Sequence, residues 1–576
     1  MNFSITGIVK AFFIAIAGWL IVAANWKLLP SAFPGFWLEW PPFHHGEDEM
    51  IYSFLFSLSK VMGLLLLALY VLVVVDWTGE KSMQFTRWLD GNFKKLVTIT
   101  LENWKIAIQY DKGVKLVFIL WALLMLTCLL TLPYHYDEAW SYHYFSRQGW
   151  LRTISFYPLP NNHIFFNLIV VLFSWLPFDT VITTRLPSLF AVFIGSFYFL
   201  KLCRFYFSGN LSVFLTLLLS SMYPFILYGV EGRGYGFMIC FSILQLYGAN
   251  QLALEYRNRK YRMLYFFALV AGLYTITSHL YFVLPVHALL FAYVVKNKRW
   301  RVFMFDSIKA ALVVLVLYWI IVYCNGLKVL THPNGSVHPD DKQLMPAIWE
   351  HLRSTWFWLT DSHLSIFSVL LLLLAPMADC ILKKRKIYWL NISIFVLLIS
   401  PPFILFFQRL VFYVRLWTYL IVPMVIGLGF LLSLVATVIT PSSFYPRLRR
   451  AVYWYPSVLA VMLLINFSLF IREHRKSFAI DYAIEVLFRK IQPDLSLSTT
   501  IYFTRQSLEF YAAEQLVYRE ERINPDRPME MSAEGAVSGQ DVLILSPSIG
   551  VKEIPQLVNY KLAGQYPGVF SLYIKK

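Results

Sequence analysis

Long apolar segments separated by short polar loops recur along the chain from residue 5 to residue 471. Runs of about 17 to 25 apolar residues are long enough to cross the hydrocarbon core of a bilayer as helices. Because hydrocarbon offers the backbone no hydrogen-bond partner, such segments must pair their own amide and carbonyl groups, as α-helices do. The composition agrees, since 58% of the residues are hydrophobic and 18% are aromatic. The sequence therefore predicts an α-helical polytopic membrane protein and excludes a soluble globular chain.

The lengths of these runs predict about thirteen transmembrane helices. They lie near residues 5–24, 53–75, 115–132, 183–203, 211–228, 233–253, 262–279, 280–295, 307–324, 364–382, 387–407, 412–438 and 452–471. One further apolar run, at residues 161–176, is short for a span and favours an interfacial or re-entrant helix.

Basic residues indicate the topology of these spans. The net charge is +17, but the basic residues form short clusters and no continuous face, which argues against a nucleic-acid partner. The positive-inside rule places these clusters in the cytoplasm. They lie at residues 81–115, 257–262, 296–301, 383–386 and 447–450. If residues 161–176 do not cross, the N-terminus is cytoplasmic, and the loops around Asp137 and Glu231, the loop 325–363 and the C-terminal tail are external.

The hydropathy pattern predicts three parts of the chain. Residues 1–114 form a two-helix transmembrane extension with a basic cytoplasmic loop, and residues 115–471 form the transmembrane core. Residues 472–576 lose the long apolar runs and form a small external α/β domain. Its strands are expected at residues 500–503, 541–545 and 569–574, with a helix at 506–515.

The first apolar run, at residues 5–24, lacks a charged n-region and a cleavage site, so it is interpreted as a retained span. The five cysteines show no metal-ligand spacing or disulfide framework.

Two adjacent carboxylates, Asp137 and Glu138, follow the predicted span at residues 115–132. An aspartate with an ordinary pKa of about 3.9 is ionised at neutral pH and can act as a base. Neighbouring side chains diverge in a helix or a strand, so Asp137 is the preferred base of the pair. Alternatively, both carboxylates only begin an amphipathic helix at residues 139–148, where negative charge is favourable.

A glycine-rich segment, YGVEGRGYG at residues 228–236, joins two predicted spans on the external face. Ionisable residues at such a depth are costly and usually line a site or pathway. Glycine lets backbone and ligand approach closely, and Arg233 has the donor geometry for a phosphate. The alternative is that Glu231 and Arg233 only pair with each other.

The order of several short motifs resembles that of type C glycosyltransferases, in the branch of protein O-mannosyltransferases and bacterial lipid A aminoarabinose transferases. The resemblance covers about a third of the chain, residues 116–291. Its motifs are Asp137-Glu138, PLPNNH at 158–163, RLPS at 185–188, Glu231-x-Arg233-x-Tyr235 and TSHLY at 277–281. The sequence departs from the family at residues 161–163, where relatives often carry a His-Pro-Pro-Leu-like segment.

This resemblance implies a type C fold, a sugar donor carried on a polyprenyl phosphate and transfer on the external face. It also implies interfacial helices in the first external loop and a catalytic role for Asp137, with Glu138 beside it. Candidate residues for the donor phosphate or substrate are His163, Arg185, Glu231, Arg233, Tyr235, His279 and Arg409.

A divalent cation, Mg²⁺, Mn²⁺ or Ca²⁺, is a further expectation, held by the oxygens of Asp137 and Glu231 against the donor phosphate. The predicted function is a single, inverting displacement to an acceptor hydroxyl of a lipid, glycan or protein. The predicted location is the bacterial inner membrane. A transporter or lipid-linked sugar flippase is the main alternative, although no repeated halves are apparent. The third interpretation is a noncatalytic membrane scaffold that displays the C-terminal domain.

Overall fold

The computed structural model describes most of the chain from residue 112 onward. The described residues are 112–157, 162–325, 339, 342–360, 366–382, 389–411, 413–439, 445–479, 481–482, 501–503, 531–532, 542–545, 559–566 and 570–575. The chain divides into two units, Met1–Lys115 with Trp319–Thr331, and Leu116–Tyr318 with His332–Lys576. The predicted spans at residues 5–24 and 53–75 lie outside the described residues. The second unit contains the site and is described below.

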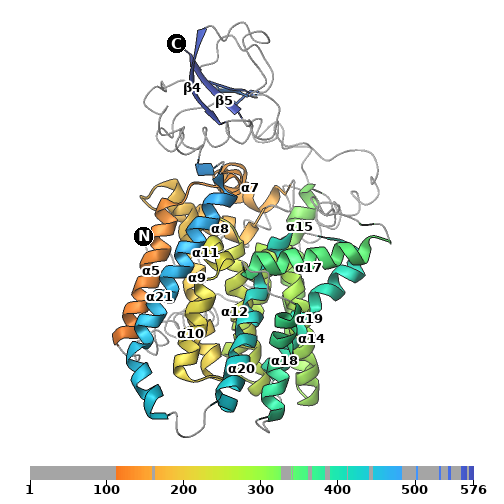
Figure 1. Ribbon diagram of the computed structural model, residues 1–576. Helices are drawn as coiled ribbons and strands as arrows, with labels where there is room; N and C mark the ends of the chain where they lie inside the picture. The colour runs from red at the N-terminus through yellow and green to blue at the C-terminus, as the bar shows by residue number, and fades with distance from the viewer. Residues whose placement is uncertain are drawn as a thin grey trace, which may run out of the picture. The chain divides into compact units, whose positions relative to one another are not determined.

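The described part of the chain is dominated by helices. In order they are α5 (Lys112–Thr131), α6 (Tyr136–Ser141), η2 (Tyr142–Ser146), α7 (Gly149–Ser155), α8 (Ile164–Phe173), α9 (Thr180–Arg204), α10 (Gly209–Ser220), α11 (Tyr223–Val230), α12 (Tyr235–Leu254), α13 (Arg259–Thr275), η3 (Thr277–His279), α14 (Leu280–Lys296), α15 (Trp300–Asn325), α17 (Leu344–Thr360), α18 (Ile366–Leu382), α19 (Trp389–Gln408), η4 (Val414–Leu420), α20 (Ile421–Ile439) and α21 (Tyr445–Ser477). In Figure 1 the long helices run roughly side by side, and α17 lies across them.

Within the described ranges, eight helices are long and apolar enough to cross a membrane, or nine if one bent pair counts as a span. Each predicted span after residue 114 coincides with a helix or with this pair, so the class of polytopic helical membrane protein is confirmed. The total of thirteen stays a prediction. The bent pair is a correction in detail, because the run 211–228 was predicted as one span, whereas α10 and α11 meet at 63°.

Helix α12 lies at the centre of the helical unit, between α9 and α13. Of its apolar window, 94% is buried, whereas the corresponding share for α21 is 22%. Small residues let membrane helices approach closely. A Cβ atom at Gly195 of α9 would lie 3.4 Å from Cys240 of α12, and one at Gly248 of α12 would lie 3.2 Å from Tyr265 of α13. Helix α12 is therefore packed closely against neighbours on both sides.

The polypeptide between α5 and α9 forms four short helices, α6, η2, α7 and α8. The apolar helix α8 has 10 residues. At about 1.5 Å per residue it is too short to cross a bilayer alone. This agrees with the prediction of a non-crossing helix at residues 161–176. The short helices after α5 can therefore contribute side chains to a site at one end of the helical bundle.

Gly236 lies where α12 begins beside the end of α11. A Cβ atom at this position would overlap the backbone carbonyl oxygen of Tyr228. Because backbone cannot move aside as a side chain does, Gly236→Ala is expected to destabilise the protein by about 1–3 kcal/mol or more. Thermal unfolding of the purified protein measures the loss. Gly195→Ala is the control, since its Cβ would make contacts of 3.4 Å or longer, and equal melting temperatures for both variants would contradict the expectation.

The C-terminal region contains a five-stranded sheet with the strand order β2-β1-β3-β5-β4. The strands are β1 (Ile501–Phe503), β2 (Met531–Ser532), β3 (Val542–Leu545), β4 (Tyr560–Tyr566) and β5 (Phe570–Lys575). Strand β1 pairs in parallel with β2 and β3, and β5 pairs antiparallel with β3 and β4. The three predicted strands match β1, β3 and β5, and the predicted helix at 506–515 lies outside the described residues. Parallel pairing requires crossover connections, which is typical of an α/β fold.

Candidate active site

The carboxylates Asp137 and Glu138 stand in the first turn of α6, just after the end of α5. His135 is the N-cap residue, with its Nδ1 3.3 Å from the Asp137 amide nitrogen, a hydrogen bond that only the neutral ring accepts. Glu138 Oε2 accepts one from the His135 amide at 2.9 Å, which completes a capping box. The carboxylates therefore do begin a helix, as one interpretation of the sequence expected. Their side chains, however, diverge and enter different surroundings.

Glu138 forms a buried ion pair with Arg185 of α9. The Arg185 Nε donates to Glu138 Oε1 at 2.8 Å and its Nη2 to Oε2 at 2.7 Å, with side-chain exposures of 2% and 1%. Arg185 also donates to three carbonyl oxygens at the end of α5, and the amide of Gly232 donates to Glu138. This pair thus joins α5, α6, α9 and the glycine-rich turn. Both side chains are almost fully buried, and neither lines the larger cavity described below.

Asp137 is bound by two arginines from distant parts of the sequence. Arg415 of η4 donates from Nη1 to Asp137 Oδ2 at 2.7 Å, and Arg233 Nη2 lies 3.6 Å from the same oxygen. Arg233 is fully buried and also donates to the Asp137 carbonyl oxygen and to Ser141 Oγ. Although burial opposes ionisation, Arg233, His135 and Arg415 hold the pKa of Asp137 well below its ordinary value. Asp137 is therefore ionised at neutral pH.

Glu231 pairs with His135, whose Nδ1 lies 3.3 Å from Glu231 Oε1. The burial of His135 lowers its pKa, but the hydrogen bond and charge of Glu231, with the charges of Asp481 and Asp137, raise it to about 9. Phe478, just after α21, packs edge-on against His135 with ring centroids 4.7 Å apart. Glu231 and Arg233 thus each bind the segment around Asp137, and the alternative that they serve only each other does not describe this turn.

A cavity of about 380 Å³ lies at these residues, named the polar cavity here for the charged side chains in its otherwise largely apolar wall. It is lined by His135, Asp137, Tyr223, Leu227, Tyr228, Glu231, Tyr235, Phe357, Trp358, Tyr413, Val414, Arg415, Glu473, Ser477 and Phe478. Aromatic rings form much of its wall. The ring centroid of Tyr228 lies 4.5 Å from that of Tyr235 and 5.9 Å from that of Trp358. Aromatic faces beside a few charged groups are typical of sites for small polar molecules.

Three other predicted site residues do not line this cavity. His163 is buried and accepts a hydrogen bond from the Gly234 amide at 2.8 Å, so it supports the glycine-rich turn. His279 is fully buried against Gly272, with Nε2 3.3 Å from Gln245 Oε1. Arg409 has a positive φ of 52° at the end of α19 and is not among the lining residues. Asp137, Glu231 and Tyr235 are the predicted site residues that line the cavity, with Arg233 directly behind Asp137.

A divalent cation was predicted between Asp137 and Glu231. The ligand atoms of His135, Asp137 and Glu231 lie within 4.8 Å of one another, so the donor set is present. Both carboxylates, however, already have partners, because two arginines bind the Oδ2 atom of Asp137 and His135 pairs with Glu231. With a pKa of about 9, His135 adds a positive charge at neutral pH. The residues as arranged therefore fit an anion better than a cation.

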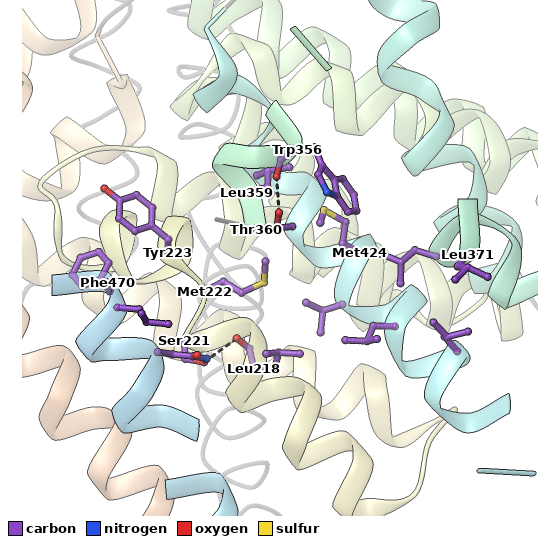
Figure 2. Close-up of a pocket in the computed structure, with 16 residues that line it drawn as sticks. Leu218, Ser221, Met222, Tyr223, Trp356, Leu359, Thr360, Leu371, Met424 and Phe470 are labelled. Atoms are coloured by element: carbon purple, nitrogen blue, oxygen red, sulfur yellow. Dashed lines mark hydrogen bonds between the residues drawn. The ribbon is translucent and has the colours of Figure 1, made fainter. Parts of the chain in front are cut away.

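An apolar cavity of about 470 Å³ lies next to the polar one, and Tyr223 lines both. Figure 2 shows its labelled wall, where Trp356, Met424 and Phe470 come from α17, α20 and α21, and Met222 from the break between α10 and α11. Its polar groups are already hydrogen-bonded in part, because Asn466 donates to Ser221 at 2.7 Å. Such a cavity suits a hydrocarbon chain.

The bundle around α12, the short helices after α5 and the carboxylates at their start define a polytopic membrane protein with a type C glycosyltransferase-like fold. Among solved structures, ArnT from Cupriavidus metallidurans in the apo state is similar, with a TM-score of 0.52 and 12% identity over 80% of this chain and 97% of that one. ArnT from the same organism bound to undecaprenyl phosphate gives a TM-score of 0.48 and 14% identity, over 81% and 98%. No family model and no curated protein matches the sequence. The fold implied by the sequence motifs is confirmed.

Proposed function

We propose that this protein is a membrane glycosyltransferase that transfers a sugar from a polyprenyl-phosphate-linked donor to an acceptor hydroxyl. The observation that carries this proposal is the ionised Asp137 on the wall of a polar cavity, with Arg415 beside it. A carboxylate that can accept a proton and a cation that can bind a phosphate are the two groups such a transfer needs. The likeness of the fold to ArnT supports the same class of reaction.

The reaction is a single displacement. The acceptor hydroxyl gives its proton to the carboxylate of Asp137, and its oxygen forms a bond to the anomeric carbon of the donor sugar. The bond between that carbon and the phosphate oxygen breaks, and the polyprenyl phosphate leaves with the electron pair. Because bond formation and bond breaking occur on opposite faces of the anomeric carbon, the configuration inverts.

Arg233 and Arg415 both affect this mechanism in two opposing ways. They keep Asp137 ionised, but they also hold its pKa low, which makes it a weak base in the ligand-free protein. The negative charge of a bound phosphate lies close to Arg415, so the ion pair between Arg415 and Asp137 becomes weaker. The donor thus prepares Asp137 to take the proton from the acceptor.

The apolar cavity is the proposed place for the lipid chain of the donor. Its wall meets the polar cavity at Tyr223, so a phosphate near Arg415 and a chain beyond Tyr223 occupy neighbouring spaces. The acceptor remains open among lipid, glycan and protein hydroxyls. The proposed location is the bacterial inner membrane, with the site on the periplasmic face.

Donor turnover tests the proposal. The purified protein in nanodiscs is incubated with a panel of polyprenyl-phosphate sugars and a membrane lipid extract as the source of acceptors, and the release of polyprenyl phosphate is measured. We expect release with at least one donor. In a parallel assay the protein is reconstituted in liposomes with fluorescent polyprenyl-phosphate lipids. Movement of lipid between leaflets without cleavage would instead identify a flippase.

A further inference from the structure

We propose that Arg415 takes the place of a divalent cation at this site, where it bridges Asp137 and the phosphate of the donor. This inference rests on the proposed function, because it assigns the phosphate of that donor to a particular side chain. The site then binds polyprenyl phosphate without a metal ion.

The position of Arg415 makes such a bridge possible. Its Nη1 donates to Asp137 Oδ2 at 2.7 Å, while its side chain lines the polar cavity and remains 32% exposed. Its Nε is buried and has no hydrogen-bond partner. The guanidinium also lies over two rings, 4.7 Å from the centroid of Tyr413 and 5.9 Å from that of Tyr235. One part of the fork thus binds the carboxylate, while the side chain keeps exposed surface on the cavity wall, where a second group can approach it.

The charges around Arg415 favour an anion. A divalent cation between carboxylate and phosphate supplies positive charge and fixes the distance between the two oxygens. Arg415 supplies both, since a guanidinium can bind oxygens of two groups through its planar set of donors. Arg233 stands behind Asp137 as a second, fully buried positive charge. With two arginines at Asp137 and His135 3.3 Å from Glu231, both carboxylates of the predicted cation site already have partners.

Binding of undecaprenyl phosphate tests this inference without knowledge of the sugar. Wild type, Arg415→Gln and the control Arg353→Gln are titrated with this lipid in nanodiscs, once with EDTA and once with MnCl₂. Arg353 is a suitable control because it lies on α17, is 70% exposed and pairs with Glu350. Thermal unfolding shows whether each variant is folded. Arg415→Lys, which keeps the charge but loses the fork, is a second variant in case Arg415→Gln does not fold.

We expect wild type and Arg353→Gln to bind equally well with EDTA and with MnCl₂. Arg415→Gln should bind at least tenfold more weakly in EDTA, and MnCl₂ should restore part of that loss, because the removal of Arg415 leaves an uncompensated carboxylate for the ion. A merely structural role would not produce this metal response. Arg415→Lys should bind with intermediate affinity.

Two results would overturn the inference alone: loss of wild-type binding in EDTA, or unchanged affinity in a folded Arg415→Gln or Arg415→Lys. In both cases wild type still binds the lipid in at least one condition, so the proposed donor class survives. If wild type binds no undecaprenyl phosphate with either EDTA or MnCl₂, the proposed function itself fails, and the inference fails with it.

Discussion

Asp137→Asn is expected to abolish sugar transfer and to leave the fold intact. The substitution keeps the size of the side chain, but an amide cannot accept the proton of the acceptor hydroxyl. General-base catalysis contributes about a hundredfold to ten-thousandfold to a rate, so turnover should fall by that factor. The variant should still bind undecaprenyl phosphate at least as well as wild type, because Arg415 loses the carboxylate that competes for it.

The measurement compares kcat for release of polyprenyl phosphate in wild type, Asp137→Asn and a control, Glu350→Gln. Glu350 is an exposed carboxylate on α17, so its conversion to an amide should leave turnover unchanged. Binding of undecaprenyl phosphate and thermal unfolding are measured on the same samples. A folded Asp137→Asn with a kcat within threefold of wild type would remove Asp137 from the role of base.

Arg185→Leu is expected to cause the largest loss of stability of any substitution considered. It removes the partner of Glu138 and leaves a carboxylate uncompensated in a site that is almost fully buried. Breaking a buried ion pair in this way costs about 3–5 kcal/mol. It also removes the hydrogen bonds to the end of α5. Thermal unfolding in detergent should show a large decrease in melting temperature.

Arg262→Leu provides a matched control for Arg185→Leu. Arg262 pairs with Asp306 at 3.0 Å, but the two side chains are 24% and 19% exposed, so water still solvates the remaining carboxylate. The expected loss is smaller, because the penalty for an unpaired charge falls with exposure. Equal melting temperatures for the two variants would show that the Glu138–Arg185 pair does not organise the site.

The helical core was predictable because the hydropathy of each apolar run depends only on the residues within that run. Span length follows from hydrophobic thickness, and every predicted run after residue 114 falls on a helix or on the bent pair. The bend between α10 and α11 was missed, since hydropathy alone does not detect a break inside an apolar run. Ser221 and Pro224 beside the bend were the available signals, because both favour turns or helix starts.

The site was predictable only in part. Asp137 and Glu231 stood out because charges beside apolar runs are unusual, and the motif order connected them. Glu138 and Arg185 are also charged residues beside apolar runs, yet they form a buried ion pair. Only the tertiary packing distinguishes such a pair from charged residues that line the cavity. His135 was overlooked as a neighbour of Asp137 in the loop. No local pattern distinguishes Arg415 from the other basic residues near the ends of the spans or shows which distant residue it will meet.

The contact between Asp137 and Arg415 joins residues 278 positions apart. During synthesis, the loop that contains Asp137 leaves the ribosome long before η4 and α20 are made. The nascent chain therefore carries an incomplete site through most of its insertion into the membrane. The segment that carries Arg415 must be made and reach its place before the carboxylate gains its second arginine. Maturation of the site is thus a late event in biogenesis, and a prematurely terminated chain would lack it even if its earlier helices had inserted correctly.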